Sequence, residues 1–208
     1  MNTSTINSVD LLIFTVYVIV TSYVLYQAYK SLEIKVVIAP DMDYLNQQLE
    51  EKEIKDIIDI SFKFASSYRI EDLTKIPIVI KNKTKDESLH LDWDECTITD
   101  FDGVSARAIR IAPGIVDVPQ KQAIEKIAPN RKIDENLSDD KSIKGSLFKP
   151  LKLKKAAAKK TPFFLRLFFT RVNIAGGRAS YAVECRFLPK KLRLKKAITL
   201  AFKPRKSK

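Results

Sequence analysis

Residues 11–29, LLIFTVYVIVTSYVLYQAY, form an uncharged stretch that constrains the fold more than any other part of the sequence. At about 1.5 Å of rise per residue, a helix of this length nearly matches a hydrocarbon core of roughly 30 Å. Tyr23, Tyr26 and Tyr29 recur towards its C-terminal end, where aromatic side chains gather at a membrane interface. The pattern predicts a membrane-spanning helix over residues 11–30, after a short tail over residues 1–10.

Two other kinds of segment share this composition. A buried helix of a soluble domain is one alternative. A cleaved signal peptide fits less well, because no Lys or Arg precedes the stretch and KSLEIKVV after it offers no A-x-A-like cleavage site. Lys30 and Lys35 follow the stretch, so the positive-inside rule places the bulk of the chain in the cytoplasm. We therefore expect a single-pass protein of the cell membrane.

Residues 31–56 are expected to connect the anchor to a folded domain and to contain a surface helix. Pro40 ends a short extended run, and Asp41 is placed to cap a helix that continues through MDYLNQQLEEKEIKD. The apolar side chains of this helix make only a narrow stripe, which is typical of a helix lying on a surface.

From residue 57 onwards apolar and polar side chains alternate with a period of two, as in half-buried strands. The runs IDISF, IPIVI, LHLDW, FFLRLFF and YAVEC show the alternation, and Gly, Pro and Asn punctuate the chain between them. Gly176-Gly177 supplies the positive φ that a tight hairpin turn between residues 163 and 187 needs. The pattern predicts a mainly β fold with an antiparallel, immunoglobulin-like β-sandwich over residues 57–189.

Charge divides the chain sharply. Residues 1–140 carry 16 Lys and Arg against 24 acids, whereas residues 141–208 carry 21 Lys and Arg and one acid, Glu184. The basic residues are densest at 149–160 and in a tail over 190–208. A solvated face, a surface for anionic lipid, and a surface for an acidic protein or nucleic acid are the alternatives. The contact residues of such a surface would be Lys152, Lys154, Lys155, Lys159, Lys160, Arg166, Lys190, Lys191, Arg193, Lys195 and Lys196.

The stretch HLDWDECTITDFDG, residues 90–103, gathers four aspartates, a glutamate, a cysteine and the only histidine of the chain. It lacks the D-x-[DN]-x-[DN]-G spacing of a calcium loop, and a zinc site needs more than one His and one Cys. The chain contains no nucleophile-elbow, P-loop or dinucleotide-binding motif. The sequence therefore predicts no metal, no cofactor, no small-molecule substrate and no enzymatic activity.

A β-hairpin explains the acidic stretch better. If the stretch pairs with residues 104–112, Trp93 faces the core only when paired residue numbers sum to an even number, 202 or 204. Either sum sets Arg110 opposite Asp92 or Asp94, an exposed pair that favours the correct register.

The turn of this hairpin is expected at Asp100–Gly103, where Gly103 supplies the left-handed residue. One difficulty remains, because Cys96 and Ile98 fall on the opposite face from Trp93. A bulge near Asp94–Cys96, or a strand buried on both faces, would account for it.

The run IKNKTKDESLHLDWDECTITDFDGVSARAIR, residues 80–110, resembles a pattern of uncharacterised bacterial membrane-anchored proteins and lipoproteins. There an N-x-T turn leads into a strand with WD, then D-x-x-G, a Ser and R-x-I-R. The resemblance implies a small β-sandwich domain and no established activity. Those lipoproteins begin with a lipobox cysteine, which this chain lacks. The matching residues are Asn82, Thr84, Trp93, Asp94, Asp100, Gly103, Ser105, Arg107, Ile109 and Arg110.

These observations predict a single-pass, non-catalytic membrane protein whose β domain is an interaction or scaffold module, such as an accessory subunit of a membrane complex. The alternative is a binder of polyanions through the basic C-terminal third. The expected partners are the membrane itself and either a protein or anionic lipid, with nucleic acid less favoured because no RRM, KH or helix-turn-helix signature is present.

Overall fold

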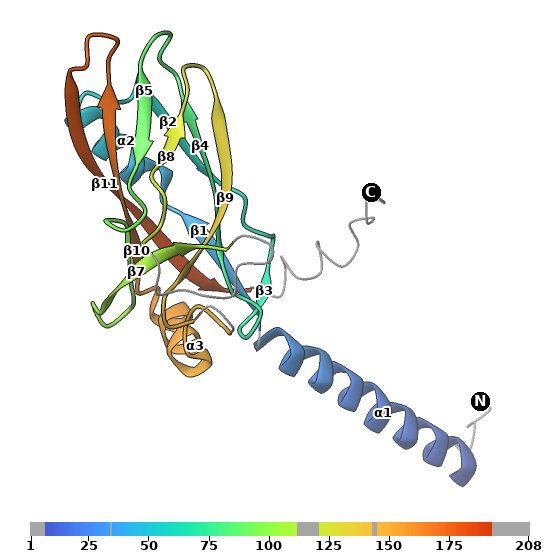
Figure 1. Ribbon diagram of the computed structural model, residues 1–208. Coiled ribbons are helices and arrows are strands. Elements are labelled where there is room, and N and C mark those ends of the chain that lie inside the picture. The colour runs from blue at the N-terminus through green and yellow to red at the C-terminus, as the bar shows by residue number, and fades with distance from the viewer. Residues whose placement is uncertain (1–6, 34, 112–120, 143–144, 193–208) are drawn as a thin grey trace. The chain divides into compact units, whose positions relative to one another are not determined.

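The computed structural model describes residues 7–33, 35–111, 121–142 and 145–192 (Figure 1). The chain divides into two compact units, one formed by residues 1–35 with 192–208 and the other by residues 36–191.

The N-terminal unit contains helix α1 (Ser8–Glu33). Within the described residues it holds the one stretch, Val9–Gln27, that is long and apolar enough to cross a membrane. The hydroxyl of Thr15 donates to Leu11 O at 2.8 Å, and that of Thr21 donates to Tyr17 O at 2.7 Å. These two hydroxyl groups are thus satisfied by the helix itself, as an apolar environment requires.

The second unit is mainly β and includes two short helices. Its elements are β1 (Lys35–Pro40), α2 (Met42–Glu51), β2 (Ile58–Phe62), β3 (Tyr68–Arg69), β4 (Ile76–Asn82), β5 (Ser88–Leu91), β6 (Thr97–Thr99), β7 (Ser105–Arg110), β8 (Glu125–Ile127), β9 (Lys132–Asp139), α3 (Pro150–Lys159), β10 (Phe163–Val172) and β11 (Arg178–Lys191).

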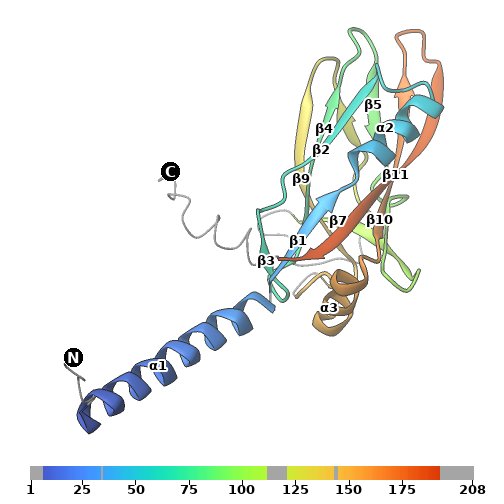
Figure 2. The same ribbon diagram turned by 180° about the vertical axis from the view of Figure 1, so that it is seen from behind.

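The strands join in one curled sheet with the order β2-β4-β9-β7-β6-β10-β11-β1-β3, while β5 pairs with both β10 and β8 (Figures 1 and 2). The pairings from β2–β4 through β10–β11 to β1–β11 are antiparallel. The expectation of a mainly β, antiparallel fold is confirmed. The immunoglobulin-like arrangement stays a prediction.

Aromatic rings gather in the core of the domain. The ring of Phe187 on β11 lies 4.8 Å from that of Phe62 on β2 and 4.8 Å from that of Phe163 on β10. Phe148 continues the cluster at 4.8 Å from Phe163. Strand β2, at one end of the sheet order, therefore shares a core with β10 and β11. Aromatic pairs of this kind add to the stabilisation that apolar burial provides.

The expected hairpin between residues 163 and 187 is confirmed as β10–β11. Its register sets Phe163 opposite Phe187 and Val172 opposite Arg178. Gly176 adopts φ +81° in the turn, a conformation that glycine adopts without steric cost.

The two helices of the domain both pack against β11. Helix α2 begins as expected, because Asp41 Oδ1 accepts the N–H of Tyr44 at 3.1 Å, and it buries Leu45 and Leu49. Helix α3 was not expected. Pro150 occupies its first turn, where the missing N–H costs nothing, and Leu153, Ala156 and Ala157 are its buried side chains.

Candidate functional site

A local insertion in the strand beside β10 explains why the inward face switches within the acidic stretch. Strand β5 ends opposite Phe169 and β6 begins opposite Arg166, so residues 92–96 face only Leu167 and Phe168. The segment between β5 and β6 thus has five residues where β10 has two, an excess of three. Because this excess is odd, the positions that point into the core change from odd to even numbers.

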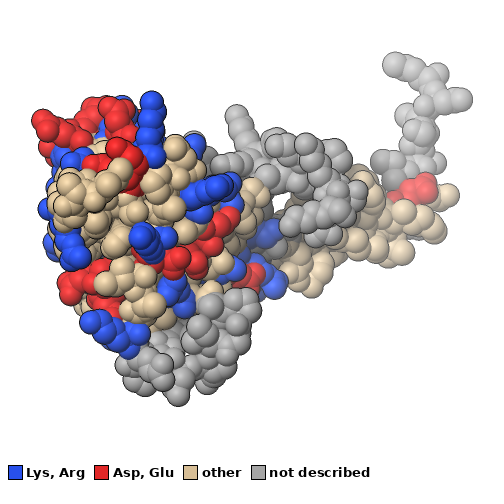
Figure 3. Space-filling model, turned by 45° about the horizontal axis from the view of Figure 1, so that its top comes forward, with Lys and Arg blue, Asp and Glu red and all other residues tan. Residues whose placement is uncertain are grey.

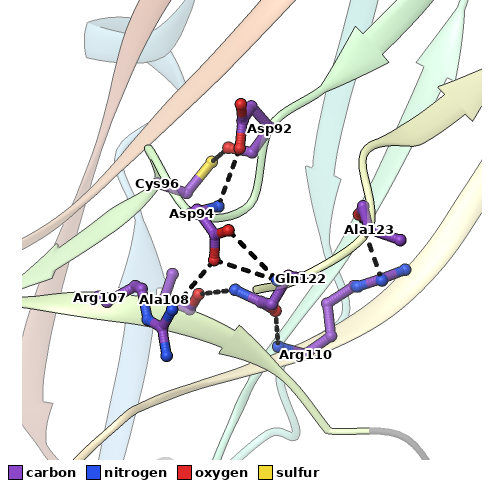
Figure 4. Close-up of polar contacts among 8 residues, drawn as sticks. All are labelled: Asp92, Asp94, Cys96, Arg107, Ala108, Arg110, Gln122 and Ala123. Carbon is purple, nitrogen blue, oxygen red and sulfur yellow. Dashed lines mark hydrogen bonds and ion pairs between the residues drawn. The ribbon is translucent and has the colours of Figure 1, made fainter. Parts of the chain in front are cut away.

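Cys96 closes the backbone gap that this insertion leaves. Its thiol accepts the N–H of Phe168 at 3.3 Å. It also donates to Asp92 O at 3.2 Å (Figure 4). Trp93 and Cys96 are both fully buried, as the insertion permits. Burial raises the pKa of the Cys96 thiol to about 12, so the group is neither a thiolate nucleophile nor a ready metal ligand at neutral pH.

Asp94 joins the insertion to two segments further along the chain (Figure 4). Its Oδ1 lies 3.1 Å from Arg107 Nη1 on β7, and its two oxygens accept the backbone N–H of Gln122 at 3.3 and 3.2 Å. The side chain of Gln122 donates to Ala108 O at 2.8 Å and accepts the N–H of Arg110 at 3.0 Å. Gln122 therefore bonds the edge of β7 where β6 no longer pairs with it.

The expected pairing of Arg110 with an aspartate is wrong. The Arg110 guanidinium forms an ion pair with Glu125 on β8 and lies 5.8 Å over the ring of Trp93. The insertion carries Asp94 to Arg107 instead, while Asp92 Oδ1 accepts the N–H of Asp94 at 3.1 Å. Both aspartates lie in a turn rather than on the face of a strand.

The expected turn and the even register are confirmed further along. Thr97 pairs with Arg107 and Thr99 with Ser105, each pair summing to 204. Gly103 has φ +81°. Asp100 Oδ1 organises the turn by accepting the N–H of Asp102 at 2.9 Å and that of Val104 at 3.0 Å.

The acidic turn and the basic helix meet at Lys152. Its Nζ lies 3.3 Å from Asp100 Oδ2 and also pairs with Asp102. Burial by itself would raise the pKa of Asp100, but the two backbone N–H groups and Lys152 outweigh it and lower that pKa. Lys152 is therefore engaged within the domain and does not belong to an open basic surface.

The other predicted contact residues occupy several elements. Lys154, Lys155 and Lys159 are exposed on α3, and Lys160 is exposed directly after it. Arg166 is exposed on β10 opposite Glu184, and Lys190 and Lys191 are exposed at the end of β11. Arg193, Lys195 and Lys196 lie outside the described residues.

The sequence analysis overlooked Leu151, an apolar side chain that is 76% exposed on α3 among these lysines. Pro150 followed by Leu, Lys and Ala, all good helix formers, is the signal that could have found the helix and its two faces. Gln122 and Glu125 were also overlooked, and no local pattern marks either residue.

The chemistry available to this region is limited. The described residues contain no group of three or more His, Cys, Asp or Glu side chains that could hold a metal ion. Burial lowers the pKa of His90, assisted by Lys126 and Arg178, which favours the neutral imidazole. A cavity of about 160 Å³ lies between α3 and the Asp100–Gly103 turn, lined by side chains that include Ile98, Phe148 and Lys152. Pockets for small molecules usually measure roughly 300–1,000 Å³.

No family model matches the sequence, and no curated protein matches it. One similar solved structure is the X-ray structure of Northeast Structural Genomics Consortium target SoR45, which is 12% identical. The match covers 65% of this chain and 88% of that chain with a TM-score of 0.32, too low to carry an argument about fold or function.

Proposed function

We propose that the chain is a single-pass, non-catalytic membrane protein whose β domain serves as an interaction or scaffold module, such as an accessory subunit of a larger membrane complex. The observation that carries this proposal is the exposure of the apolar helix. Val9–Gln27 spans 19 residues, and none of this stretch is buried. Exposing an apolar surface of that size to water is unfavourable in free energy, and insertion into a bilayer removes the whole surface from water.

The polar groups of the β domain support the non-catalytic part of the proposal. The carboxylate of Asp94 bonds Arg107 and a backbone N–H, and Glu125 pairs with Arg110. These groups hold the insertion, the edge of β7 and β8 together, rather than converging on a substrate-sized pocket.

The proposal includes two further elements. It keeps an immunoglobulin-like sandwich as the form of the domain, supported by the packing of Phe62 on β2 against Phe187 on β11. It also places the domain in the cytoplasm, supported by Lys30 and Lys35 after the apolar stretch.

Alkaline carbonate extraction of membranes from cells that express the full chain with a C-terminal tag tests the anchor. The intact chain should stay in the membrane pellet, and N-terminal sequencing should begin at or near residue 1. A matched variant, Val16→Arg with Ile19→Arg, should move to the soluble fraction because each charge costs about 3 kcal/mol at the centre of a span. Recovery of the wild-type chain in the soluble fraction, or cleavage after residue 27, would contradict the proposal.

Polyanion binding is a second candidate function, and the exposed lysines of α3 favour it. Residues 149–160 contain no acid. Binding of this kind weakens steeply as salt rises. Equal retention of the detergent-solubilised chain on heparin resin at 0.1 M and 1 M salt would contradict this candidate.

A further inference from the structure

We infer that the outward face of α3 lies on the anionic head groups of the same membrane that α1 spans. This basic face comprises Leu151, Lys154, Lys155, Ala158 and Lys159, all exposed. The inference rests on the proposed membrane anchor and names the partner of the basic C-terminal third as lipid rather than protein or nucleic acid.

The two faces of α3 differ in the way that a helix lying on a membrane requires. Leu153, Ala156 and Ala157 face the domain, whereas the basic face combines lysines with one large apolar side chain, Leu151, which is 76% exposed. Lysine stems cover apolar surface while their ammonium groups reach the head groups, and an apolar side chain among them enters the acyl boundary. Nucleic acid would use the lysines but would leave Leu151 without an apolar partner, whereas a lipid surface offers both kinds of contact.

The acids that form ion pairs with α3 do not oppose this arrangement. The nearby turn contains Asp100 and Asp102, and Lys152 pairs with both. Lys152 points to the turn from the half-buried side of the helix, while Lys155 and Lys159 remain on the exposed side. The ion pairs therefore fix the helix on the domain and reduce the repulsion that these two carboxylates would exert on anionic lipid.

The connectivity of the chain brings this part of the domain close to the bilayer. The apolar stretch ends at Gln27 and the β domain begins at Val36, so eight residues, 28–35, connect them. Residues 28–33 continue helix α1 and add about 9 Å, and the two residues that remain add at most about 7 Å. Val36 pairs with Lys191, so the start of β1 and the end of β11 lie together.

Helix α3 lies at this same end of the domain. Both views show it beside the start of β1 and the end of β11, at the opposite end from the β10–β11 turn (Figures 1 and 2). Figure 3 is tilted to bring forward the end that carries that turn, and basic and acidic side chains are mixed on the surface it shows. The end of the domain that the chain enters from the anchor is thus the end that carries the basic face.

The test uses the full chain in lipid nanodiscs and a fluorescent probe on α3. Ala158→Cys is exposed, whereas the native Cys96 and Cys185 are buried with raised pKa values, so an environment-sensitive thiol dye labels position 158 selectively. Lipids with a spin-labelled acyl chain quench a dye that lies at the bilayer surface. The matched control is Ile174→Cys in the β10–β11 turn, 84% exposed at the other end of the domain.

In discs that contain about one-third anionic lipid, the probe at position 158 should be quenched at least twofold more than the probe at position 174. The excess should vanish in neutral discs, in 1 M salt, and in the variant Lys155→Glu with Lys159→Glu. The same charge change at the end of the domain that carries the β10–β11 turn, Lys85→Glu with Arg178→Glu, should leave the excess quenching at position 158 unchanged. Equal quenching of both probes, or no dependence on lipid charge, would overturn the inference. Failure of the chain to enter the discs would instead refute the proposed anchor.

Discussion

Lys152 Nζ on α3 lies 3.3 Å from Asp100 Oδ2 in the β6–β7 turn. This contact joins the two features that stand out in the sequence, the acidic stretch and the basic third. It also gives Asp100 two roles, because its other oxygen accepts the N–H groups of Asp102 and Val104. The acidic turn therefore also binds α3 through Lys152, while the body of that helix packs against β11.

The two partners of this contact should contribute unequally to stability. Asp100→Ala removes the acceptor of two backbone N–H groups and should lower the free energy of unfolding by about 1–3 kcal/mol. Lys152→Met removes only a partly exposed ion pair and should have a much smaller effect. Urea titration of the full chain in detergent, followed by the fluorescence of the buried Trp93, measures both. Equal losses would show that the ion pair, rather than the turn, carries the stability.

Stability should fall in acid through Asp41 and Asp100. The N–H of Tyr44 and then Arg186 lower the pKa of Asp41 below 3.8, and the pKa of Asp100 is also lowered. A carboxyl whose pKa is lower in the folded state stabilises fully above its unfolded pKa and loses that contribution as pH falls through the folded pKa. The urea concentration at the unfolding midpoint should therefore decrease once the pH falls below about 4. Asp41→Asn should make this decrease shallower. If the urea midpoint of Asp41→Asn decreased in acid as steeply as that of the native chain, this assignment would be contradicted.

Glu135 should act in the opposite sense. Burial raises its pKa above 4.5, and the charge of Arg110 only partly offsets this. A carboxyl with a raised folded pKa favours the folded state most when it is protonated, and it loses that contribution as pH rises through the folded pKa. The urea midpoint should thus rise slightly as pH falls towards 4.5, before the acid drop begins. Glu135→Gln should abolish this rise without changing the drop.

Gly103 offers a test of backbone conformation in isolation. Its φ is +81°, yet a Cβ atom placed there would meet no heavy atom within 4 Å. Gly103→Ala should cost about 1 kcal/mol from the left-handed conformation alone. Gly145→Ala, also without a neighbour within 4 Å and without a positive φ, is the matched control and should be neutral or slightly stabilising. The urea midpoints of the two variants should differ accordingly.

The sequence predicted those features that depend on local pattern. Asp41 marked the start of α2, and Gly103 and Gly176 marked turns. Alternation located β2, β4, β5, β10 and β11. The requirement that paired residue numbers sum to an even number also predicted the register of β6 and β7. The same rule failed for Arg110 because the insertion between β5 and β6 can be recognised only when both strands are paired with β10. The acidic stretch by itself does not show that β10 is their neighbour. Gln122 lies 28 residues from Asp94, so that contact exists only once the sheet has formed.

Cys96 should matter as a hydrogen-bonding group rather than as a reactive thiol. Cys96→Ala leaves the N–H of Phe168 without its acceptor and should cost about 2–4 kcal/mol from this loss plus the cavity. Cys185→Ala, which is equally buried, tests the cavity alone and should cost less. In the native chain neither thiol should react with a thiol reagent at pH 8 until urea unfolds the domain. Rapid labelling of either thiol in the folded chain would contradict the burial described above.

Gln122 should hold the edge of β7 although it belongs to no strand. Gln122→Leu removes the bonds to Ala108 O and Arg110 N, leaves two backbone groups without partners, and should lower the free energy of unfolding by about 2–4 kcal/mol. Hydrogen exchange should speed up at the N–H of Arg110, because this N–H bonds the lost side chain. It should not speed up at the N–H of Ala108, which bonds Cys96 O at 2.8 Å. Gln47→Ala, an exposed glutamine on α2, should change neither quantity. If Gln122→Leu destabilised the domain while the Arg110 N–H kept its protection, the side chain of Gln122 would not be what holds the edge of β7.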